Sequence, residues 1–324
     1  MAVYTQVPAE VLAAFLRRFD VGELVSAKGI AEGVENSNYL VDTTGKDGGG
    51  GCFILTLYEK RVATGDLPFF RALTDHLAAK GNPVPRMIAD RDGAWLHELE
   101  GRPACLIEFL PGVSATRPTA AQARNAGAAL GRMHASTADF VPCRRNTMGV
   151  DSWGPLFERC GRSLDEIAPG LHDQLAWAID DTTSGWFGDD FDHCAIHADL
   201  FPDNVLMRGD AVSGLIDVYF ACTDIRVYDL AVAHTAWGFD AGGRRYDAAI
   251  GDALVAGYER HFPLSPFERA QFNTLAVGAC IRFTLSRAWD WLNTPANALV
   301  TRKDPMGYWH RAKHYDPEML RSRR

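Results

Sequence analysis

The sequence predicts a bilobal α+β protein, with a small antiparallel-sheet lobe over residues 1–108 and a larger, mostly helical lobe over residues 109–324. Strand-like alternation and glycine-rich turns dominate the first part of the chain. After Pro118, apolar residues recur every three or four positions, as they do in amphipathic helices. One short β segment, residues 193–221, interrupts these helices. A chain of 324 residues can bury a sizeable core, so two lobes of this size are expected to fold.

The first lobe mixes helical and strand patterns. Apolar spacing predicts helices over residues 8–19 and 66–80, and Gly81 ends the second of them. Runs of alternating and β-branched residues predict short strands at residues 38–43, 52–58, 87–89, 95–99 and 104–109. The glycine-rich stretch 45–51 separates the first two strands and predicts a flexible hairpin loop.

The second lobe is dominated by helical spacing. Helices are predicted over residues 119–137, 171–182, 245–261 and 267–292, the last as one helix or two. Thr119 precedes the first of these helices and is a suitable N-cap. In the β segment, the apolar runs 205–207 and 211–216 flank a polar turn, which predicts a hairpin.

Composition and charge narrow the class of protein. The formal net charge is −8, and the only basic cluster lies at Arg321, Arg323 and Arg324, so we expect no nucleic-acid partner. Seven scattered cysteines without a C-x-x-C pair argue against a disulfide framework or a zinc site. We see neither a signal segment nor an apolar run long enough for a membrane span, so we expect no membrane partner and a cytoplasmic location. The oligomeric state stays open.

The strongest chemical motif is H-x-D-x-x-x-x-N, formed by His197, Asp199 and Asn204. The predicted hairpin follows it directly, and Asp217 stands at the end of the second strand. Because a hairpin returns its far end to its start, Asp199, Asn204 and Asp217 are expected to converge. The motif alone can arise by chance, since Asp and Asn are ordinary residues at strand ends and turns.

That convergence suits phosphoryl transfer from ATP to an alcohol. Asp199 would accept the proton of the attacking hydroxyl, and Asn204 and Asp217 would hold Mg²⁺ against the phosphates. We expect His197 to bond backbone groups and fix the loop rather than act as an acid or base. His134, His234 and His261 have no ligand spacing, and we expect them to be packed or solvated.

The segments HADLFPDN and LIDVYFACTD resemble the aminoglycoside-phosphotransferase and choline-kinase superfamily, which has a protein-kinase-like fold. The resemblance implies that ATP is the phosphoryl donor, that Mg²⁺ is required, and that Asp229, in an Asp-Leu-Ala element, is structural. The chain lacks the D-F-G glycine and the A-P-E element of protein kinases.

Four segments narrow the resemblance to bacterial homoserine kinases of the second type: residues 35–39, 53–59, 195–204 and 282–291. This similarity implies phosphorylation of the L-homoserine hydroxyl to O-phospho-L-homoserine, on the route to threonine. The alternatives are a kinase of the same superfamily that acts on choline, an aminosugar or an aminoglycoside, and a non-catalytic nucleotide-binding protein.

Nucleotide contacts are expected mainly in the first lobe. Ser37 and nearby backbone N–H groups lie where such kinases place the loop over the phosphates. Thr56 stands where the superfamily has a phosphate-binding Lys. Either Lys60 or Arg61 is therefore expected to reach the phosphates, or the metal and backbone groups do most of that work. Glu108 and Leu110 resemble the hinge, where adenine would pair with backbone groups and the side chains would only pack.

An amino-acid acceptor needs a cation for its carboxylate and an acid for its ammonium group. Arg282 or Arg287 is the candidate for the first role, and Asp224 for the second. The two arginines are five residues apart, about 140° around a helix, so one face cannot present both fully. The competing interpretation is a surface ion-pair network with Trp289 and Trp291 in the core.

Overall fold

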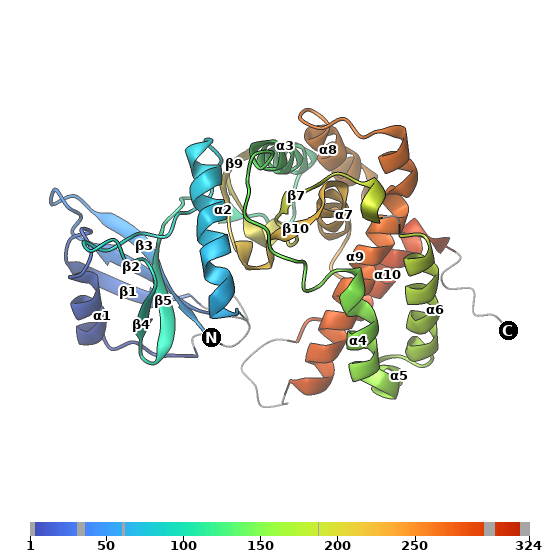
Figure 1. The fold of residues 1–324 in the computed structure, drawn as a ribbon, viewed down its shortest axis with the longest axis horizontal. Helices are drawn as coiled ribbons and strands as arrows, with labels where there is room; N and C mark the ends of the chain where they lie inside the picture. The colour runs from blue at the N-terminus through green and yellow to red at the C-terminus, as the bar shows by residue number, and fades with distance from the viewer. Residues whose placement is uncertain (1–3, 31–35, 60–61, 187, 295–301, 318–324) are drawn as a thin grey trace. The chain divides into compact units, whose positions relative to one another are not determined.

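The computed structural model describes residues 4–30, 36–59, 62–186, 188–294 and 302–317. The chain divides into two compact units, residues 1–111 and 112–324 (Figure 1). This division falls after Pro111, whereas the sequence placed the boundary after residue 108. Each unit has its own secondary structure, described in turn below.

The first unit is a five-stranded antiparallel sheet with two helices (Figure 1). The strand order is β1-β2-β3-β5-β4, with bounds β1 Leu24–Gly29, β2 Asn36–Thr43, β3 Gly51–Tyr58, β4 His97–Leu99 and β5 Arg102–Glu108. The helices are α1 Ala9–Leu16 and α2 Leu67–Ala79. The strand expected over residues 87–89 is only an isolated bridge between Met87 and Ile107, and the strand expected from residue 95 starts at His97.

The core of the first unit lies against one face of the sheet. Leu12 and Leu16 of α1 are buried together with Tyr39 and Val41 of β2, and with residues of β3 and β5. Tyr39 and Val41 are two positions apart, so both point to the same face of the strand. The short amphipathic helix therefore closes the core side of an alternating strand, as the sequence pattern predicts.

The second unit is mainly helical and contains two small sheets. Its helices are α3 Ala120–Ser136, α4 Val150–Cys160, α5 Leu164–Ile167, α6 Leu171–Ser184, α7 Arg226–Trp237, α8 Ala248–Tyr258, α9 Pro266–Asn293 and α10 Met306–Tyr315. The sheets are β10-β7 and β6-β8-β9, with bounds β6 Val113–Ser114, β7 His193–Ile196, β8 Val205–Arg208, β9 Ala211–Leu215 and β10 Cys222–Ile225.

Helix α9 is the central support of the second unit, where it packs against α4, α6, α7 and α10 (Figure 1). It is one continuous helix of 28 residues, which resolves the expectation of one helix or two. A capping box fixes its start, because Ser265 Oγ accepts from the Glu268 N–H and the Glu268 carboxylate accepts from the Ser265 N–H. Helix α9 is therefore a long helix with a firmly anchored start.

Helices α3 and α8 approach each other closely because each carries a glycine at the crossing. A Cβ built at Gly127 of α3 or at Gly257 of α8 would lie 1.9 Å from a backbone oxygen of the other helix. Only glycine fits at such a distance. This close packing brings His134, near the end of α3, against Tyr258, at the end of α8.

Candidate active site

The loop that carries Asp199 folds back on the hairpin that follows it. Asn204 Nδ2 donates to the Asp199 carbonyl oxygen (2.7 Å) and to its Oδ2 (3.1 Å). The β8–β9 hairpin returns Ile216 to this point, because the Ile216 N–H donates to the Asn204 carbonyl (3.0 Å). Asp217 follows Ile216 directly, and its charge acts on Asp199. The predicted convergence of Asp199, Asn204 and Asp217 is present in the structure.

His197 holds the same loop through backbone contacts. Its ring Nε2 lies 3.0 Å from the Ile216 carbonyl oxygen, to which it donates. The side chain is fully buried, and this burial lowers the pKa of His197, so the ring is neutral near pH 7. The expected bond from His197 to a backbone group is present, and its role in fixing the loop stays a prediction.

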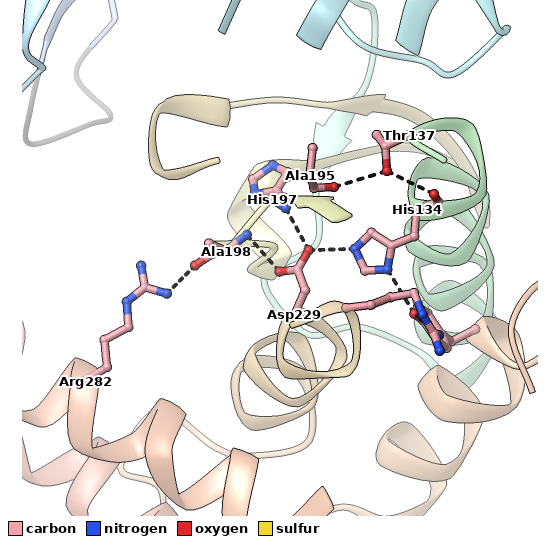
Figure 2. A network of polar contacts seen from close by, with 9 residues as sticks. His134, Thr137, Ala195, His197, Ala198, Asp229 and Arg282 are labelled. Atoms are coloured by element: carbon pink, nitrogen blue, oxygen red, sulfur yellow. Dashed lines mark hydrogen bonds and ion pairs between the residues drawn. The ribbon is translucent and has the colours of Figure 1, made fainter. Parts of the chain in front are cut away.

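Ala198, immediately before Asp199, adopts a backbone conformation that is unusual for its type. Its φ angle is 62°, in the left-handed region, which costs a residue with a Cβ about 1–2 kcal/mol. Two buried charged side chains hold it there. Asp229 Oδ1 accepts from the Ala198 N–H (2.8 Å), and Arg282 Nη1 donates to the Ala198 carbonyl (2.6 Å), as Figure 2 shows.

Asp229 has the structural role that the sequence indicates. It is fully buried in α7, and its carboxylate accepts three N–H groups: His197 N–H (2.7 Å), Ala198 N–H (2.8 Å) and the His134 ring (3.0 Å) (Figure 2). Burial alone would raise its pKa, but the hydrogen bonds that it accepts from the His134 ring and from the His197 backbone lower the pKa of Asp229 below its ordinary value. Asp229 is therefore a fixed anion beneath the catalytic loop.

A chain of buried hydrogen bonds continues from Asp229 to the start of α9. Tyr258 Oη lies 2.9 Å from His134 Nδ1 and 3.0 Å from Arg226 Nη1, and Arg226 Nη2 lies 2.6 Å from Glu268 Oε1. An arginine can only donate, so Tyr258 Oη accepts a hydrogen bond from Arg226 and donates its own O–H to His134 Nδ1. His134 then donates from Nε2 to Asp229. One direction of donation therefore runs from Arg226 through Tyr258 and His134 to Asp229.

Asp199 itself sits in an environment that disfavours its charge. Burial raises the pKa of Asp199 to about 8, with the Arg282 charge opposing the shift and the Asp217 charge adding to it. The Lys303 charge also opposes this rise in the pKa of Asp199, and the Asp203 charge adds to it. A carboxyl with a pKa near neutrality is well suited to exchange a proton during catalysis.

The charges of Arg282 and Arg287 both act on Asp199, although the two arginines are five residues apart on α9. Arg282 is 2% exposed, and its guanidinium lies 4.5 Å from the Phe283 ring in addition to its bond with Ala198. Arg287 is half-buried, with Nη1 3.4 Å from the Asp304 carbonyl and its guanidinium 4.5 Å from the Tyr308 ring. The expected surface ion-pair network is absent at both arginines within the described residues.

Asp224 lies on β10, where the register pairs it with Cys194, five residues before Asp199. Its carboxylate already accepts two hydrogen bonds, from Asn146 Nδ2 to Oδ2 (2.6 Å) and from the Ile225 N–H to Oδ1 (2.7 Å). These contacts fix the carboxylate in place. They leave one acceptor site on each oxygen, so an ammonium role stays a prediction.

Ser37 corrects one expectation for the first unit. Its side chain is fully buried, with Oγ donating to Glu59 Oε1 (2.6 Å) and accepting from the N–H groups of Tyr4 (2.8 Å) and Thr5 (3.0 Å). A hydroxyl with three protein partners and no exposed surface cannot contact a nucleotide in this conformation. Ser37 instead fastens the N-terminal segment to the sheet.

The position expected to hold the phosphate-binding cation carries a buried, neutral hydroxyl. Thr56 of β3 is 2% exposed and donates to Asn38 Oδ1 across the strand pair (2.7 Å). The substitute candidate Lys60 lies outside the described residues.

Glu108 and Leu110 stand at the end of the first unit. The sequence assigned only packing to their side chains, but Glu108 forms an ion pair with Arg86 (2.6 Å) and accepts from the Arg86 N–H (3.1 Å), so that expectation was wrong for Glu108. The Glu108 N–H donates to the Arg86 carbonyl (3.0 Å). No described residue accepts from the Leu110 N–H, which leaves this donor available.

Residues that the sequence did not single out complete the site. His134 was expected to be packed or solvated; it is packed and also bonds Asp229, 95 positions away. Tyr258, Arg226 and Lys303 were not considered. One sequence signal could have indicated the buried contact of His134. This residue lies on the same apolar face of α3 as Leu130, and a polar group on a buried face needs a hydrogen-bond partner.

The described residues contain neither a cluster of metal ligands nor a membrane-spanning helix. No group of three or more His, Cys, Asp or Glu side chains in the described segments is arranged to hold a metal ion. None of the helices described is long and apolar enough to cross a bilayer.

Comparison with known proteins identifies the family. Residues 26–264 match the model of the phosphotransferase enzyme family. The chain belongs to the phosphotransferase enzyme family. Among curated relatives, the homoserine kinase of Acidiphilium cryptum is 49% identical over 97% of both chains. That of Zymomonas mobilis subsp. mobilis is 47% identical over 99% of both chains.

Solved structures of phosphotransferases and kinases have the same fold. Amicoumacin kinase, solved in complex with AMP-PNP, Ca²⁺ and Ami, has a TM-score of 0.71 at 14% identity, covering 95% of this chain and 93% of its own. Spectinomycin phosphotransferase, solved with ADP and spectinomycin, has a TM-score of 0.68 at 14% identity, covering 98% of this chain and all of its own. The predicted α+β kinase-like fold class is confirmed, as is the resemblance to this family.

Proposed function

We propose that this phosphotransferase transfers the γ-phosphoryl group of ATP to the hydroxyl of L-homoserine, giving O-phospho-L-homoserine, an intermediate in threonine biosynthesis. The observation that carries the proposal is the near-complete alignment, at 47–49% identity, with proteins named homoserine kinase. The arrangement of Asp199, Asn204 and Asp217 supports it, because all three groups that a phosphoryl transfer to an alcohol needs are together.

Asp199 is the proposed acceptor of the hydroxyl proton. It lies on a rigid loop, and burial raises its pKa to about 8, so its affinity for a proton suits a group that takes one late in the transfer. Asn204 restrains the carboxylate at Oδ2 and leaves Oδ1 to meet the acceptor. Most of the catalytic effect comes from this positioning and from neutralisation of phosphate charge.

Asn204 and Asp217 fit the requirements of Mg²⁺. A carbonyl oxygen can only accept, so the amide nitrogen of Asn204 faces Asp199, and no described residue donates to its amide oxygen. Asp217 is exposed at the end of β9 and supplies a carboxylate. Mg²⁺ prefers hard oxygen donors and keeps waters, so one amide and one carboxylate suffice, and the ion would neutralise charge on the phosphates.

The first unit is proposed to bind the nucleotide, and the second to carry the catalytic and acceptor groups. The open N–H of Leu110 and the carbonyl of Glu108 are the proposed adenine partners. Lys60 remains the proposed phosphate contact. For the acceptor, a carboxylate would bind a cation near Asp199, and Asp224 remains the candidate for its ammonium group.

The test is ADP release from Mg-ATP by purified protein with L-homoserine, beside L-serine, L-threonine, choline and kanamycin. We expect strong release with L-homoserine alone. Release with choline or kanamycin instead would keep the phosphotransferase chemistry but replace the acceptor. No release with any acceptor would favour a non-catalytic nucleotide-binding protein.

A further inference from the structure

Three cations act on the charge of Asp199 but form no ion pair with a carboxylate among the described residues. Arg282, Arg287 and Lys303 all interact with the Asp199 charge. Within the described residues, none of the three forms an ion pair. Cations gathered without protein anions are typical of a site that binds an anionic ligand, because each gains a partner when that ligand arrives.

Arg282 is the least suited of the three to bind a ligand. It is 2% exposed, and its Nη1 is bonded to the Ala198 carbonyl (2.6 Å). Its guanidinium also lies near the rings of Phe283 (4.5 Å) and Phe220 (5.6 Å). The side chain is committed to the catalytic loop, so its role is to position Ala198 and hence Asp199.

Arg287 is the better ligand group. It lies five residues further along α9, which is about 7.5 Å along the helix axis. Among the described residues its single polar contact is a long one, 3.4 Å from Nη1 to the Asp304 carbonyl, and its guanidinium lies over the Tyr308 ring. Most of its N–H donors therefore have no partner in the described part of the chain, although burial lowers the pKa of Arg287. An anion would offset that desolvation.

Lys303 stands next to the residue that Arg287 contacts. Its segment is anchored on both sides, because Arg302 Nη1 donates to the Trp291 carbonyl (3.1 Å) and the Met306 N–H donates to Asp304 Oδ1 (2.8 Å). The Lys303 side chain is exposed. An anchored backbone with an exposed cation beside Arg287 presents two positive groups to one ligand.

We infer that Arg287 and Lys303 form the subsite for the carboxylate of the amino-acid acceptor, while Arg282 positions the catalytic loop. The inference rests on the proposed function. A short carbon chain separates the hydroxyl of L-homoserine from its carboxylate, so the carboxylate must bind close to Asp199. Arg287 and Lys303, whose charges act on Asp199 and which form no ion pair with a described residue, are therefore suitably placed to select an amino acid over an amino alcohol.

The test compares L-homoserine with L-2-amino-1,4-butanediol, in which a hydroxymethyl group replaces the carboxylate. Lys303→Met and Arg287→Met are expected to raise KM for L-homoserine about 10- to 100-fold, as the loss of one charge-assisted hydrogen bond would. With the diol, both variants should lower kcat/KM much less than with L-homoserine, because the diol has no carboxylate whose contact is lost, and KM for ATP should change by less than about twofold. Lys303→Arg should restore the KM for L-homoserine.

Lys313→Met is the matched control, since Lys313 is an exposed lysine of α10. It should behave as wild type with both acceptors. Equal losses with L-homoserine and the diol, or a raised KM for ATP, would assign the cations to the phosphoryl group and overturn the inference. A wild-type enzyme without activity on L-homoserine would overturn the proposed function first, and the subsite with it.

Discussion

Arg282 Nη1 donates a 2.6 Å hydrogen bond to the carbonyl oxygen of Ala198, the residue immediately before Asp199. From the other side, Asp229 Oδ1 accepts from the Ala198 N–H (2.8 Å). A buried cation and a buried anion thus hold both ends of one left-handed residue. The position of Asp199 depends on these two contacts, since neither is supplied by regular secondary structure.

Arg282→Met should slow turnover without weakening acceptor binding. The carbonyl of Ala198 loses its donor, so the left-handed conformation is less well held and Asp199 is less often in position. We expect kcat to fall about 10- to 100-fold, with KM for L-homoserine changed by less than about threefold. Steady-state kinetics at saturating Mg-ATP measures both constants.

Arg282→Lys serves as the conservative comparison. A lysine keeps the charge and can reach a single carbonyl, so it should recover part of the lost kcat. A rise in KM for L-homoserine with kcat unchanged would contradict this account, because it would make Arg282 a carboxylate ligand.

His134→Ala should weaken the support beneath the catalytic loop. The variant removes one of three donors to Asp229 and leaves the Tyr258 hydroxyl without its acceptor. We expect the free energy of unfolding to fall by about 2–4 kcal/mol, and kcat to fall with it. Urea denaturation measures the first quantity. His261→Ala, at an exposed histidine, should change neither; a loss as large there would show that the effect is not specific to the Asp229 contact.

Stability should fall on acidification because of His234. This residue is buried, with Tyr315 Oη 2.5 Å from Nδ1 and Tyr246 Oη 3.1 Å from Nε2. Burial lowers the pKa of His234 from 6.5 to about 4. Between these values the unfolded chain binds a proton that the folded protein excludes, so the free energy of unfolding decreases as the pH falls from about 6.5 to 4.

His234→Asn should remove that part of the pH dependence. Relative to the variant, wild type is expected to lose roughly 2–3 kcal/mol over this range. Thermal or urea unfolding at several pH values checks this, with His193→Asn as the exposed control. Identical pH slopes for wild type and His234→Asn would contradict the assignment.

Ser37→Ala separates an anchoring role from nucleotide binding. Loss of the hydroxyl leaves Glu59 without one donor and frees the N–H groups of Tyr4 and Thr5. We expect the free energy of unfolding to fall by about 1–3 kcal/mol, with KM for ATP unchanged. A raised KM for ATP at wild-type stability would restore the original expectation for Ser37.

The β8–β9 hairpin was predictable because the residues that specify it are close together in the sequence. The spacing from Asp199 to Asn204, two short apolar runs and the polar turn between them fix which residues meet, and the structure brings Ile216 back to Asn204. The start of α3 after Thr119 was accessible for the same reason, since a cap is specified by a few adjacent residues.

The long-range contacts that hold the loop of Asp199 were not predictable from adjacent residues. The contact between His134 and Tyr258 spans 124 positions and depends on the glycine-mediated approach of α3 and α8. Helix α7 was missed because nearly all its residues are buried, so it lacks the polar face that produces a helical period. A nucleotide contact was expected for Ser37 because it lies where such kinases have the loop over the phosphates. Its burial depends on the N-terminal segment, whose backbone N–H groups bond its hydroxyl.

The most direct measurement is phosphorus NMR of the products formed from Mg-ATP and L-homoserine by wild type, Asp217→Asn and Asp210→Asn. Asp210 is an exposed acid in the turn of the same hairpin, so its variant controls for loss of a carboxylate. We expect wild type and Asp210→Asn to give ADP and a phosphomonoester coupled to the hydroxyl-bearing carbon of homoserine. Asp217→Asn should give almost none. An unmodified acceptor with wild type, or abundant phosphomonoester with Asp217→Asn, would contradict the proposed phosphoryl transfer or its metal site, respectively.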